Sequence, residues 1–259
     1  MGKIATVRYT VKNKCFGKKI RFAIVADLHS REYTEIDSII DILKREMPDY
    51  ILMPGDIFER LDGTGAEHKR AGLELLSKSS GIAPVIYSIG NHENGGIASW
   101  NAIKWLSIDS IPKYFDEKDL DLIRDTGAVM LDDSFTCIDG IAFGGLSSGL
   151  INKGRRPNLE WLDGFCDCKC PKVLLCHHPE YYKKYLRGRD IDLVISGHAH
   201  GGQWRIFGQG VFAPGQGIFP RYTSGVHHGK LVISKGLKPS RRIPRIFNRP
   251  EVVIVEIDN

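Results

Sequence analysis

Five short groups of metal-binding residue types follow one another between Asp27 and His200. They are Asp27-Leu28-His29, Gly55-Asp56, Gly90-Asn91-His92-Glu93, His177-His178 and Gly197-His198-Ala199-His200. Carboxylates and imidazoles together suit Mn, Fe or Zn, and the absence of cysteine from these groups argues against a thiolate site. This mixed oxygen and nitrogen set favours Mn, with Fe and Zn as the alternatives.

Each group taken alone is weak evidence. An Asp-x-His or Gly-Asp pair after a strand is commonly a capped turn, and an Asn-His pair can hydrogen-bond to loop backbone. Only Gly197-His198-Ala199-His200 is stronger, because two imidazoles on a glycine-entered loop can face one pocket. Most of the nine histidines nevertheless fall in these groups. Solvated surface histidines have no reason to gather in this way, so the sequence predicts a centre of two metal ions.

Buried strands must hold these groups in place. Each group ends an apolar run that is typical of a buried strand, over residues 20–29, 49–56, 84–93, 171–179 and 190–200. Apolar residues at helical spacing between the first runs predict helices over 36–47 and 67–79. Loops at the carboxyl ends of buried strands are where α/β folds usually place their sites. We therefore expect the five groups to converge at one edge.

The rest of the chain continues the alternation and then becomes rich in strands. We expect helices over 100–108, 117–125 and 179–189, and paired strands at 129–131 and 135–146 with a turn at Asp139-Gly140. Further strands are expected at the N-terminus, over 230–237 and over 250–258. The sequence shows no repeat and no low-complexity linker. The pattern predicts a single α/β domain over residues 1–259, with a sheet core covered by helices.

Composition limits the class of protein. The chain has 259 residues, 42% of them hydrophobic and 26% charged, as is ordinary for a globular protein. Its formal charge of +5 favours anionic partners, but no block of Lys and Arg is long enough for nucleic-acid binding to be expected. Neither a signal peptide nor a transmembrane segment is found, so a cytoplasmic location, or one peripheral to the membrane, is expected.

The six cysteines do not belong to the metal-binding groups. Nothing else in the sequence indicates secretion, so disulfides are not expected. Cys166, Cys168 and Cys170 form a CDCKC run for which a solvent-facing loop is favoured over a separate metal site, because no second cluster has structural-zinc spacing. Cys176 is expected to be buried in a strand.

The ordered groups resemble the signature of the calcineurin-like metallophosphoesterase superfamily, which is D-x-H, G-D, G-N-H-[DE], H and G-H-x-H. The match runs from residue 27 to residue 200 with no element missing. Downstream, the stretch from Gly197 to His227, LVISKGL and RIFNRPEVVIVEI resemble the small bacterial phosphoesterases of the YkuE and YaeI type. The resemblance implies a four-layer α-β-β-α sandwich of two mixed β-sheets flanked by helices.

The resemblance also implies roles for individual residues around two divalent metal ions. One metal would be held by Asp27, His29 and His200, the other by Asn91, His177 and His198, with Asp56 as the bridge. A hydroxide that bridges the metals would attack phosphorus in line, and His92 would protonate the leaving oxygen. Glu93 would either orient His92 or cap the following segment. His178 is expected to point away from the site, because alternate residues of a strand face opposite sides.

The substrate is less well defined by the sequence. Expected substrates contain a phosphodiester or pyrophosphate bond in a nucleotide or lipid-linked molecule; the alternatives are a phosphomonoesterase, acting on phosphoprotein for example, and a non-catalytic scaffold. Residues 204–219 are rich in aromatic and aliphatic side chains, which either form an apolar wall with Arg205 and Arg221 as substrate-binding groups or pack as ordinary core. The wall would allow peripheral contact with an anionic membrane.

The basic residues of the C-terminal tail have two interpretations as well. Arg241, Arg242, Arg245 and Arg249 would either bind anionic headgroups or lie in a solvated loop, and the loop is favoured. The sequence makes no prediction of the oligomeric state.

Overall fold

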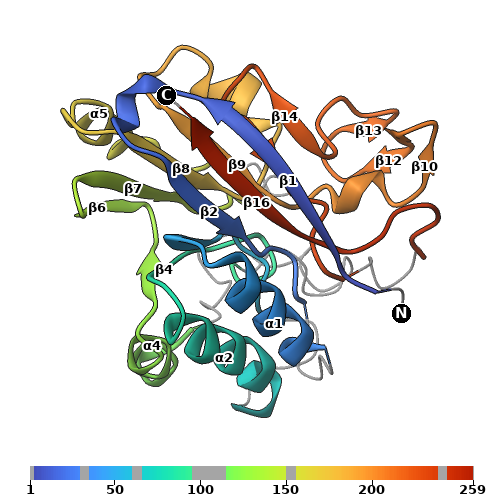
Figure 1. Ribbon diagram of the computed structural model, residues 1–259, viewed down its shortest axis with the longest axis horizontal. Coiled ribbons are helices and arrows are strands. Elements are labelled where there is room, and N and C mark those ends of the chain that lie inside the picture. Colours follow the sequence, from blue (N-terminus) through green and yellow to red (C-terminus); the bar gives the residue numbers. More distant parts are fainter. Residues whose placement is uncertain are drawn as a thin grey trace.

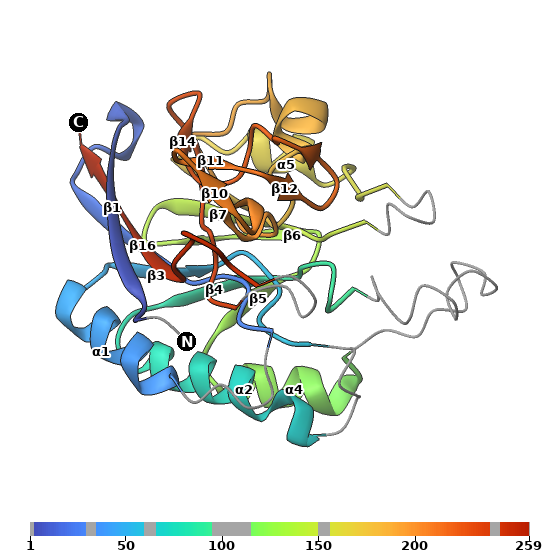
Figure 2. The ribbon, with the colours of Figure 1, turned by 90° about the vertical axis from the view of Figure 1, so that its right-hand side faces the viewer.

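The computed structural model describes residues 3–29, 35–59, 66–94, 115–149, 156–238 and 244–258. Two six-stranded mixed sheets lie face to face, and helices cover the outer face of each one (Figures 1 and 2). The expected four-layer α-β-β-α sandwich is therefore confirmed. The expected helix over 100–108 lies outside the described residues.

The first sheet has the strand order β1-β16-β2-β3-β4-β5. Its strands are β1 (Ala5–Lys12), β2 (Ile20–Ile24), β3 (Tyr50–Met53), β4 (Val85–Ser88), β5 (Val129–Leu131) and β16 (Glu251–Asp258). Strands β2 to β5 are parallel, whereas β16 runs antiparallel to β2 and parallel to β1. The residues of β3 and β4 are buried throughout. Continuous apolar runs are required there because both faces of the sheet are covered.

The second sheet has the strand order β14-β15-β9-β8-β7-β6. Its strands are β6 (Ser134–Ile138), β7 (Ile141–Leu146), β8 (Lys172–Cys176), β9 (Leu193–Ser196), β14 (Gly225–His227) and β15 (Leu231–Ile233). The central strands β7, β8, β9 and β15 are parallel, and β6 and β14 add antiparallel edges. The Asp139-Gly140 turn joins β6 to β7 as expected, with both residues in the left-handed region.

Helices cover the outer faces of the two sheets. The first sheet is covered by α1 (Ile36–Glu46), α2 (Ala66–Ser80) and α4 (Glu117–Asp125), and the second by α5 (Leu162–Cys166) and a π-helical turn, η5 (Tyr182–Leu186). The helix expected over 179–189 is thus only this short turn. Two 3-10 turns, η1 (Lys14–Phe16) and η6 (His200–Gly202), complete the helical elements of the described residues.

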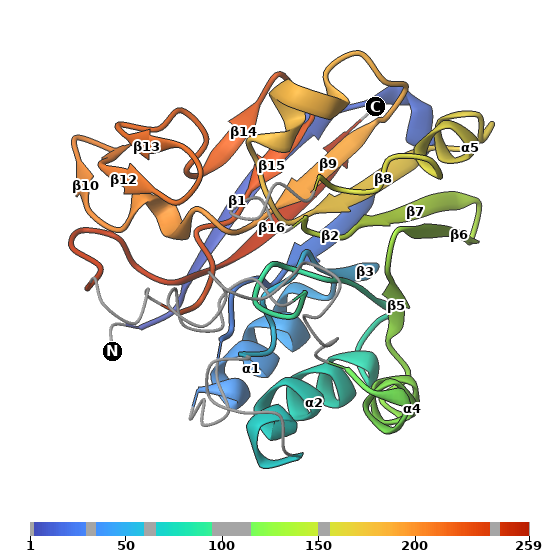
Figure 3. The same cartoon turned by 180° about the vertical axis from the view of Figure 1, so that it is seen from behind.

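Two small hairpins project beside η6. They consist of β10 (Arg205–Ile206) with β11 (Gln209–Gly210), and of β12 (Phe212–Ala213) with β13 (Gly217–Ile218). Figures 1 and 3 show them at one end of the sandwich, next to the segment that leads into β16.

The main core lies between the sheets. The rings of Phe22 and Tyr50 from the first sheet contact the ring of Phe143 from the second, with centroids 6.5 and 5.1 Å from it. All three side chains are buried. A second core fills the space between the first sheet and α1, α2 and α4, and a third lies under α5 and η5. The shared central core fixes the two sheets relative to each other.

The pairing expected for residues 129–131 is wrong. Strand β5 pairs with β4 in the first sheet and not with the β6–β7 hairpin. The chain leaves the first sheet at Asp132-Asp133, where Asp133 adopts a left-handed conformation, and enters the second sheet at Ser134. The local pattern of apolar residues does not distinguish such a passage from one sheet to the other from a hairpin within one sheet.

Gly145 of β7 tests the close approach of the two sheets. A Cβ atom at Gly145 would lie 2.5 Å from both the Cβ and the carbonyl oxygen of Leu131. We expect Gly145→Ala to lower the free energy of unfolding in urea by about 1–3 kcal/mol, because the added methyl group overpacks this contact. Gly188→Ala is the control, since its Cβ meets nothing within 4 Å. Equal unfolding midpoints for the two variants would show that the sheets do not meet as described.

Candidate metal centre

The five groups converge where strands of both sheets end. Asp27 and His29 follow β2, Asp56 follows β3, and Asn91 and His92 follow β4 of the first sheet. His177 follows β8 of the second sheet, and His198 and His200 follow β9. Asp27 and His177 are fully buried, and Asp56, His29, Asn91, His198 and His200 are at most 9% exposed. The carboxyl ends of the central strands therefore enclose a buried cluster of potential ligands.

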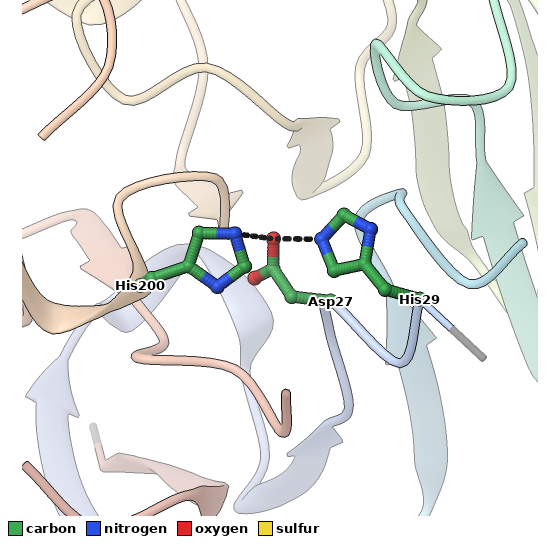
Figure 4. Close-up of side chains that lie close together, drawn as sticks. All are labelled: Asp27, His29 and His200. Atoms are coloured by element: carbon green, nitrogen blue, oxygen red, sulfur yellow. Dashed lines mark ion pairs between the residues drawn. The ribbon is translucent and has the colours of Figure 1, made fainter. Parts of the chain in front are cut away.

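Asp27, His29 and His200 form one half of this cluster (Figure 4). Oδ1 of Asp27 lies 3.6 Å from Nε2 of His29 and 3.8 Å from Nε2 of His200. All three side chains point toward one another from loops that follow β2 and β9. These distances leave space for one cation between a carboxylate and two imidazoles.

Asp56, His177 and His198 form the other half, with their ligand atoms within 4.8 Å of one another. Oδ2 of Asp56 lies 3.0 Å from Nε2 of His177 and 3.5 Å from Nε2 of His29. Asp56 therefore lies between the two halves, where a carboxylate can contact two cations at once. Ligation by all seven of these residues, including Asn91, stays a prediction.

The hydrogen bonds of the rings fit a metal site. Nδ1 of His177 lies 2.9 Å from the carbonyl oxygen of Pro54, and Nδ1 of His200 lies 2.9 Å from that of Lys238. Because a carbonyl oxygen only accepts, each Nδ1 atom carries a proton and each Nε2 atom faces the cluster, where it can bind a cation once it is deprotonated. Nε2 of His177, both ring nitrogens of His29 and Oδ1 of Asn91 are buried without a hydrogen-bond partner. Cations would satisfy these atoms.

The electrostatics of the cluster call for positive charge. Burial opposes ionisation of Asp56, but the fields of His177 and His92 outweigh it and hold the pKa of Asp56 well below its usual value. Burial also opposes protonation of His29 and His177, yet the carboxylates raise the pKa of His29 to about 10 and that of His177 to about 9. Protons on these two rings thus compensate the negative charge of the carboxylates. Divalent cations, when bound, would replace these protons.

Five of the seven expected ligands have a strained backbone. Asp27, His29, Asp56, His198 and His200 have φ values of 54°, 44°, 52°, 66° and 45°. A left-handed conformation costs roughly 1–2 kcal/mol for a residue with a Cβ atom. Backbone strain at five residues that lie close together in space indicates that function, and not stability, selects the conformation of these loops.

Glycines allow the loops to approach the carboxylates. A Cβ atom at Gly197 would lie 2.6 Å from Oδ2 of Asp27, and one at Gly236 would lie 2.5 Å from the same oxygen. A Cβ atom at Gly55 would lie 2.6 Å from the backbone nitrogen of Gly90. Gly236 is part of the site that the sequence reasoning missed, because it stands in an otherwise ordinary KGL segment.

Glu59 is the other site residue that the sequence did not reveal. It is buried three residues after Asp56, and its carboxylate lies 2.8 Å from Nδ1 of His92 and 3.5 Å from Nδ1 of His29. Nε2 of His92 lies 3.9 Å from Asp56 and so faces the cluster. Glu59 holds the Nδ1 proton of His92 and fixes the orientation of its ring. The position three residues after a Gly-Asp pair was the available signal.

Glu93 does not orient His92, since that ring is bound by Glu59. Its buried carboxylate accepts four backbone N–H groups, from Asp56, Ile57, Phe58 and Gly90. The bond from Gly90 closes the turn that precedes Glu93, so these four bonds are not the expected cap of the following segment. The other three bonds tie that turn to the Asp56 loop. Glu93 therefore positions the backbone of two of the groups, after β3 and after β4.

The expectation that His178 points away from the site is wrong. Strand β8 ends at Cys176, so strand alternation no longer applies to His178, and its ring centroid lies 4.0 Å from that of His198.

The two arginines expected to bind substrate make other contacts. The guanidinium of Arg205 donates to the carbonyl oxygens of Gly201 and Gly208, and that of Arg221 lies over the Tyr222 ring. These contacts do not direct either arginine at the cluster.

The cysteines take no part in the cluster. All six are free, and Cys176 is buried in β8 as expected. Cys166, Cys168 and Cys170 are partly exposed. Within the described ranges, the groups of side chains close enough to hold a metal ion contain histidines and carboxylates but no cysteine.

Glu93→Gln tests the positioning of the Asp56 loop. The amide nitrogen of Gln would face two backbone donors, and each unsatisfied buried donor costs about 1–3 kcal/mol. We expect the variant to unfold at lower urea concentration and to retain less metal than the wild type after reconstitution, as measured by elemental mass spectrometry. Glu160→Gln, at an exposed position, is the matched control. Unchanged metal content in Glu93→Gln would contradict the role of these bonds.

Several known proteins are similar to this chain. The chain is 25% identical over 191 residues to a bovine (Bos taurus) transmembrane protein with metallophosphoesterase domain, across 71% of this chain and 41% of that protein. It is 22% identical to the metallophosphoesterase YkuE of Bacillus subtilis, across 97% of this chain and 84% of YkuE. The solved structure of phosphopantetheinyl hydrolase from Mycobacterium tuberculosis is similar with a TM-score of 0.40 and 13% identity, over 82% of this chain and 87% of that one.

The comparison with protein families covers the site directly. Residues 20–202 match the calcineurin-like phosphoesterase family, and this range contains all five groups. In the described ranges, no helix is long and apolar enough to cross a membrane. Because the family match extends over more than half of the sequence, the chain belongs to the calcineurin-like phosphoesterase family.

Proposed function

We propose that the protein is a dinuclear metal-dependent phosphoesterase that hydrolyses a phosphodiester or pyrophosphate bond, with Mn as the first choice of metal and Fe or Zn as alternatives. The observation that carries the proposal is the convergence of buried carboxylates and imidazoles in two groups whose ligand atoms lie within 4.8 Å of one another. Asp27, His29 and His200 would hold one cation. Asn91, His177 and His198 would hold the other, and Asp56 would contact both.

Each part of the site has a separate task in the reaction. When bound, the two cations neutralise charge on the phosphoryl oxygens and activate the attacking water. The neutral amide of Asn91 limits the negative charge of the ligand set, which keeps the site attractive to an anionic substrate. Burial of the ligands excludes bulk water and strengthens these interactions.

His92 is the candidate general acid. Its Nδ1 atom is held by Glu59 at 2.8 Å, so Nε2 is the atom that faces the cluster and can donate a proton to the leaving oxygen. The pKa of Glu59 lies below its usual value, because the hydrogen bonds and charges of His29 and His92 outweigh the effect of burial. An ionised Glu59 accepts the bond from Nδ1 of His92 and keeps Nε2 directed at the cluster.

The arginines support a diester over a monoester. A phosphomonoester is nearly a dianion at neutral pH, and guanidinium groups commonly bind such dianions in a bidentate manner. Arg205 is instead engaged by backbone carbonyl oxygens, and Arg221 lies over an aromatic ring. A monoanionic phosphodiester requires less charge from the protein. Phosphomonoesterase activity is the alternative that the experiment must exclude.

Removal of His92 should affect substrates according to their leaving group. We expect His92→Ala to lower kcat about 10²–10⁴-fold on a diester of an aliphatic alcohol, and less on bis(p-nitrophenyl) phosphate, whose leaving group needs little protonation. Glu59→Gln should show the same difference between substrates at smaller magnitude. Metal content should stay near that of the wild type. Equal losses on both substrates would exclude His92 as the general acid.

The bond type is tested by adding metals back to stripped protein. With Mn restored, we expect hydrolysis of bis(p-nitrophenyl) phosphate to exceed that of p-nitrophenyl phosphate, because the site is suited to a monoanion. Zn, Fe and Mg added separately would identify the metal that restores most activity. A strong preference for p-nitrophenyl phosphate would favour the monoesterase. Inactivity toward both, despite confirmed metal binding, would favour the scaffold.

A further inference from the structure

Exposed apolar side chains gather in one part of the molecule. We call residues 203–222 and 244–250 the apolar lobe; it contains β10 to β13 and the segment before β16. Eight of the eleven large hydrophobic side chains that are exposed in the described residues belong to it. They are Trp204, Ile206, Phe207, Phe212, Ile218, Phe219, Ile246 and Phe247. The aromatic residues of 204–219 thus do not pack as ordinary core.

Backbone contacts hold the parts of the lobe together. Trp204 and Ile246 form a parallel bridge between the two parts of the lobe. Phe212 and Ile218 are direct partners in the β12–β13 hairpin. The two hairpins and the 244–250 segment lie together at one end of the sandwich in Figures 1 and 3. A concentration of exposed apolar groups on this scale marks a surface that binds a partner.

Three phenylalanines of the lobe combine exposure with backbone strain. Phe207, Phe219 and Phe247 are 104%, 64% and 89% exposed, and their φ values are 48°, 49° and 52°. Turn positions with positive φ favour Gly, Asn or Asp, because a bulky side chain is strained there. Neither core packing nor backbone preference accounts for phenylalanine at these positions. A partner that accepts separate projecting rings would account for it.

The charge around the lobe narrows the class of partner. Residues 193–250 contain nine Lys and Arg and no Asp or Glu, so this stretch has a formal charge of +9. The rest of the chain contains the other 27 basic residues and all 31 acidic residues, so its formal charge is −4. Arg221 and Arg249 are exposed, and no ion pair of either is found among the described residues. This surface is complementary to an anionic one.

The lobe is attached directly to the metal centre. Nδ2 of Asn248 donates to the carbonyl oxygen of His200, and Arg205 donates to that of Gly201. Arg245 donates to the carbonyl oxygen of Lys238, which also accepts the bond from Nδ1 of His200. The lobe is therefore tied to the loop that carries the candidate ligand His200.

We propose that the apolar lobe docks on an anionic lipid bilayer, with Phe207, Phe219 and Phe247 inserted among the lipids and Arg221 and Arg249 at the headgroups. Projecting aromatic rings flanked by arginines, in a stretch whose sequence lacks Asp and Glu, have the composition of an interfacial anchor. The carboxylate of Glu180, which approaches Gly215 from outside the lobe, is paired with His178. Protein interfaces are also enriched in aromatic residues and Arg, but their cores are closely packed, whereas these three rings project from separate left-handed positions. The docking does not depend on the proposed function. Its consequence does: the substrate would be an amphipathic phosphodiester or pyrophosphate that is reached at the headgroup level.

Flotation of the full chain with vesicles tests the docking without an activity readout. We expect the wild type to bind vesicles of phosphatidylglycerol mixed with phosphatidylcholine and to dissociate as salt rises. The triple variant Phe207→Asn, Phe219→Asn, Phe247→Asn should bind at least about tenfold more weakly, because it lacks the three rings that become buried in the bilayer. Asn tolerates the left-handed conformation, so these substitutions preserve the turns. Arg221→Glu with Arg249→Glu should weaken binding and flatten its salt dependence.

Met47→Asn is the matched control. Met47 is 73% exposed with a φ of 45° at the end of α1, which lies away from the lobe in Figures 1 and 2. This variant should bind vesicles like the wild type, and the triple variant should keep its activity on soluble bis(p-nitrophenyl) phosphate. Failure of the wild type to bind vesicles, or equal binding by the triple variant, would overturn the proposal. Wild-type dimers that dissociate in the triple variant, without vesicle binding, would instead assign the lobe to contacts between copies.

Discussion

The burial of two neighbouring carboxylates is the constraint on which the rest of the structure depends. Asp27 and Asp56 are at most 1% exposed, and each lies within 4.0 Å of Nε2 of His177. Moving an ion out of water costs several kcal/mol unless opposite charge compensates it. The histidines supply part of that charge as protonated rings, and cations would supply it more completely. Divalent cations would therefore stabilise the cluster beyond what its own protonated histidines achieve.

The fold meets this constraint by bringing two sheets to a common edge. Strands β2, β3 and β4 contribute from the first sheet and β8 and β9 from the second, so the packing of Phe22 and Tyr50 against Phe143 fixes the distance between the two sets of ligands. Left-handed backbone at the ligands and glycines beside them allow the close approach. Glu93 stabilises the arrangement through four backbone bonds, and Glu59 orients the His92 ring that faces the cluster. Stability is given up at these positions in favour of geometry.

Much of this arrangement was predictable from the sequence, and the exceptions have physical causes. The strand runs and the helices over 36–47 and 117–125 were correctly placed because their apolar periodicity is strong. Gly236 and Glu59 escaped notice because their partners are determined by tertiary contacts and not by local spacing. The β5 pairing failed because a short strand does not reveal which sheet it joins. For residues 204–219, apolar composition alone did not distinguish a packed core from the exposed surface that the structure shows.

The central claim is that two cations occupy the edge shared by the sheets. Anomalous X-ray diffraction from crystals of the Mn-reconstituted protein tests it most directly. The account predicts two Mn peaks roughly 3.5–4 Å apart, one beside Asp27, His29 and His200, the other beside Asn91, His177 and His198, with Asp56 in contact with both. A single peak, or peaks away from these side chains under conditions that restore activity, would contradict the dinuclear centre.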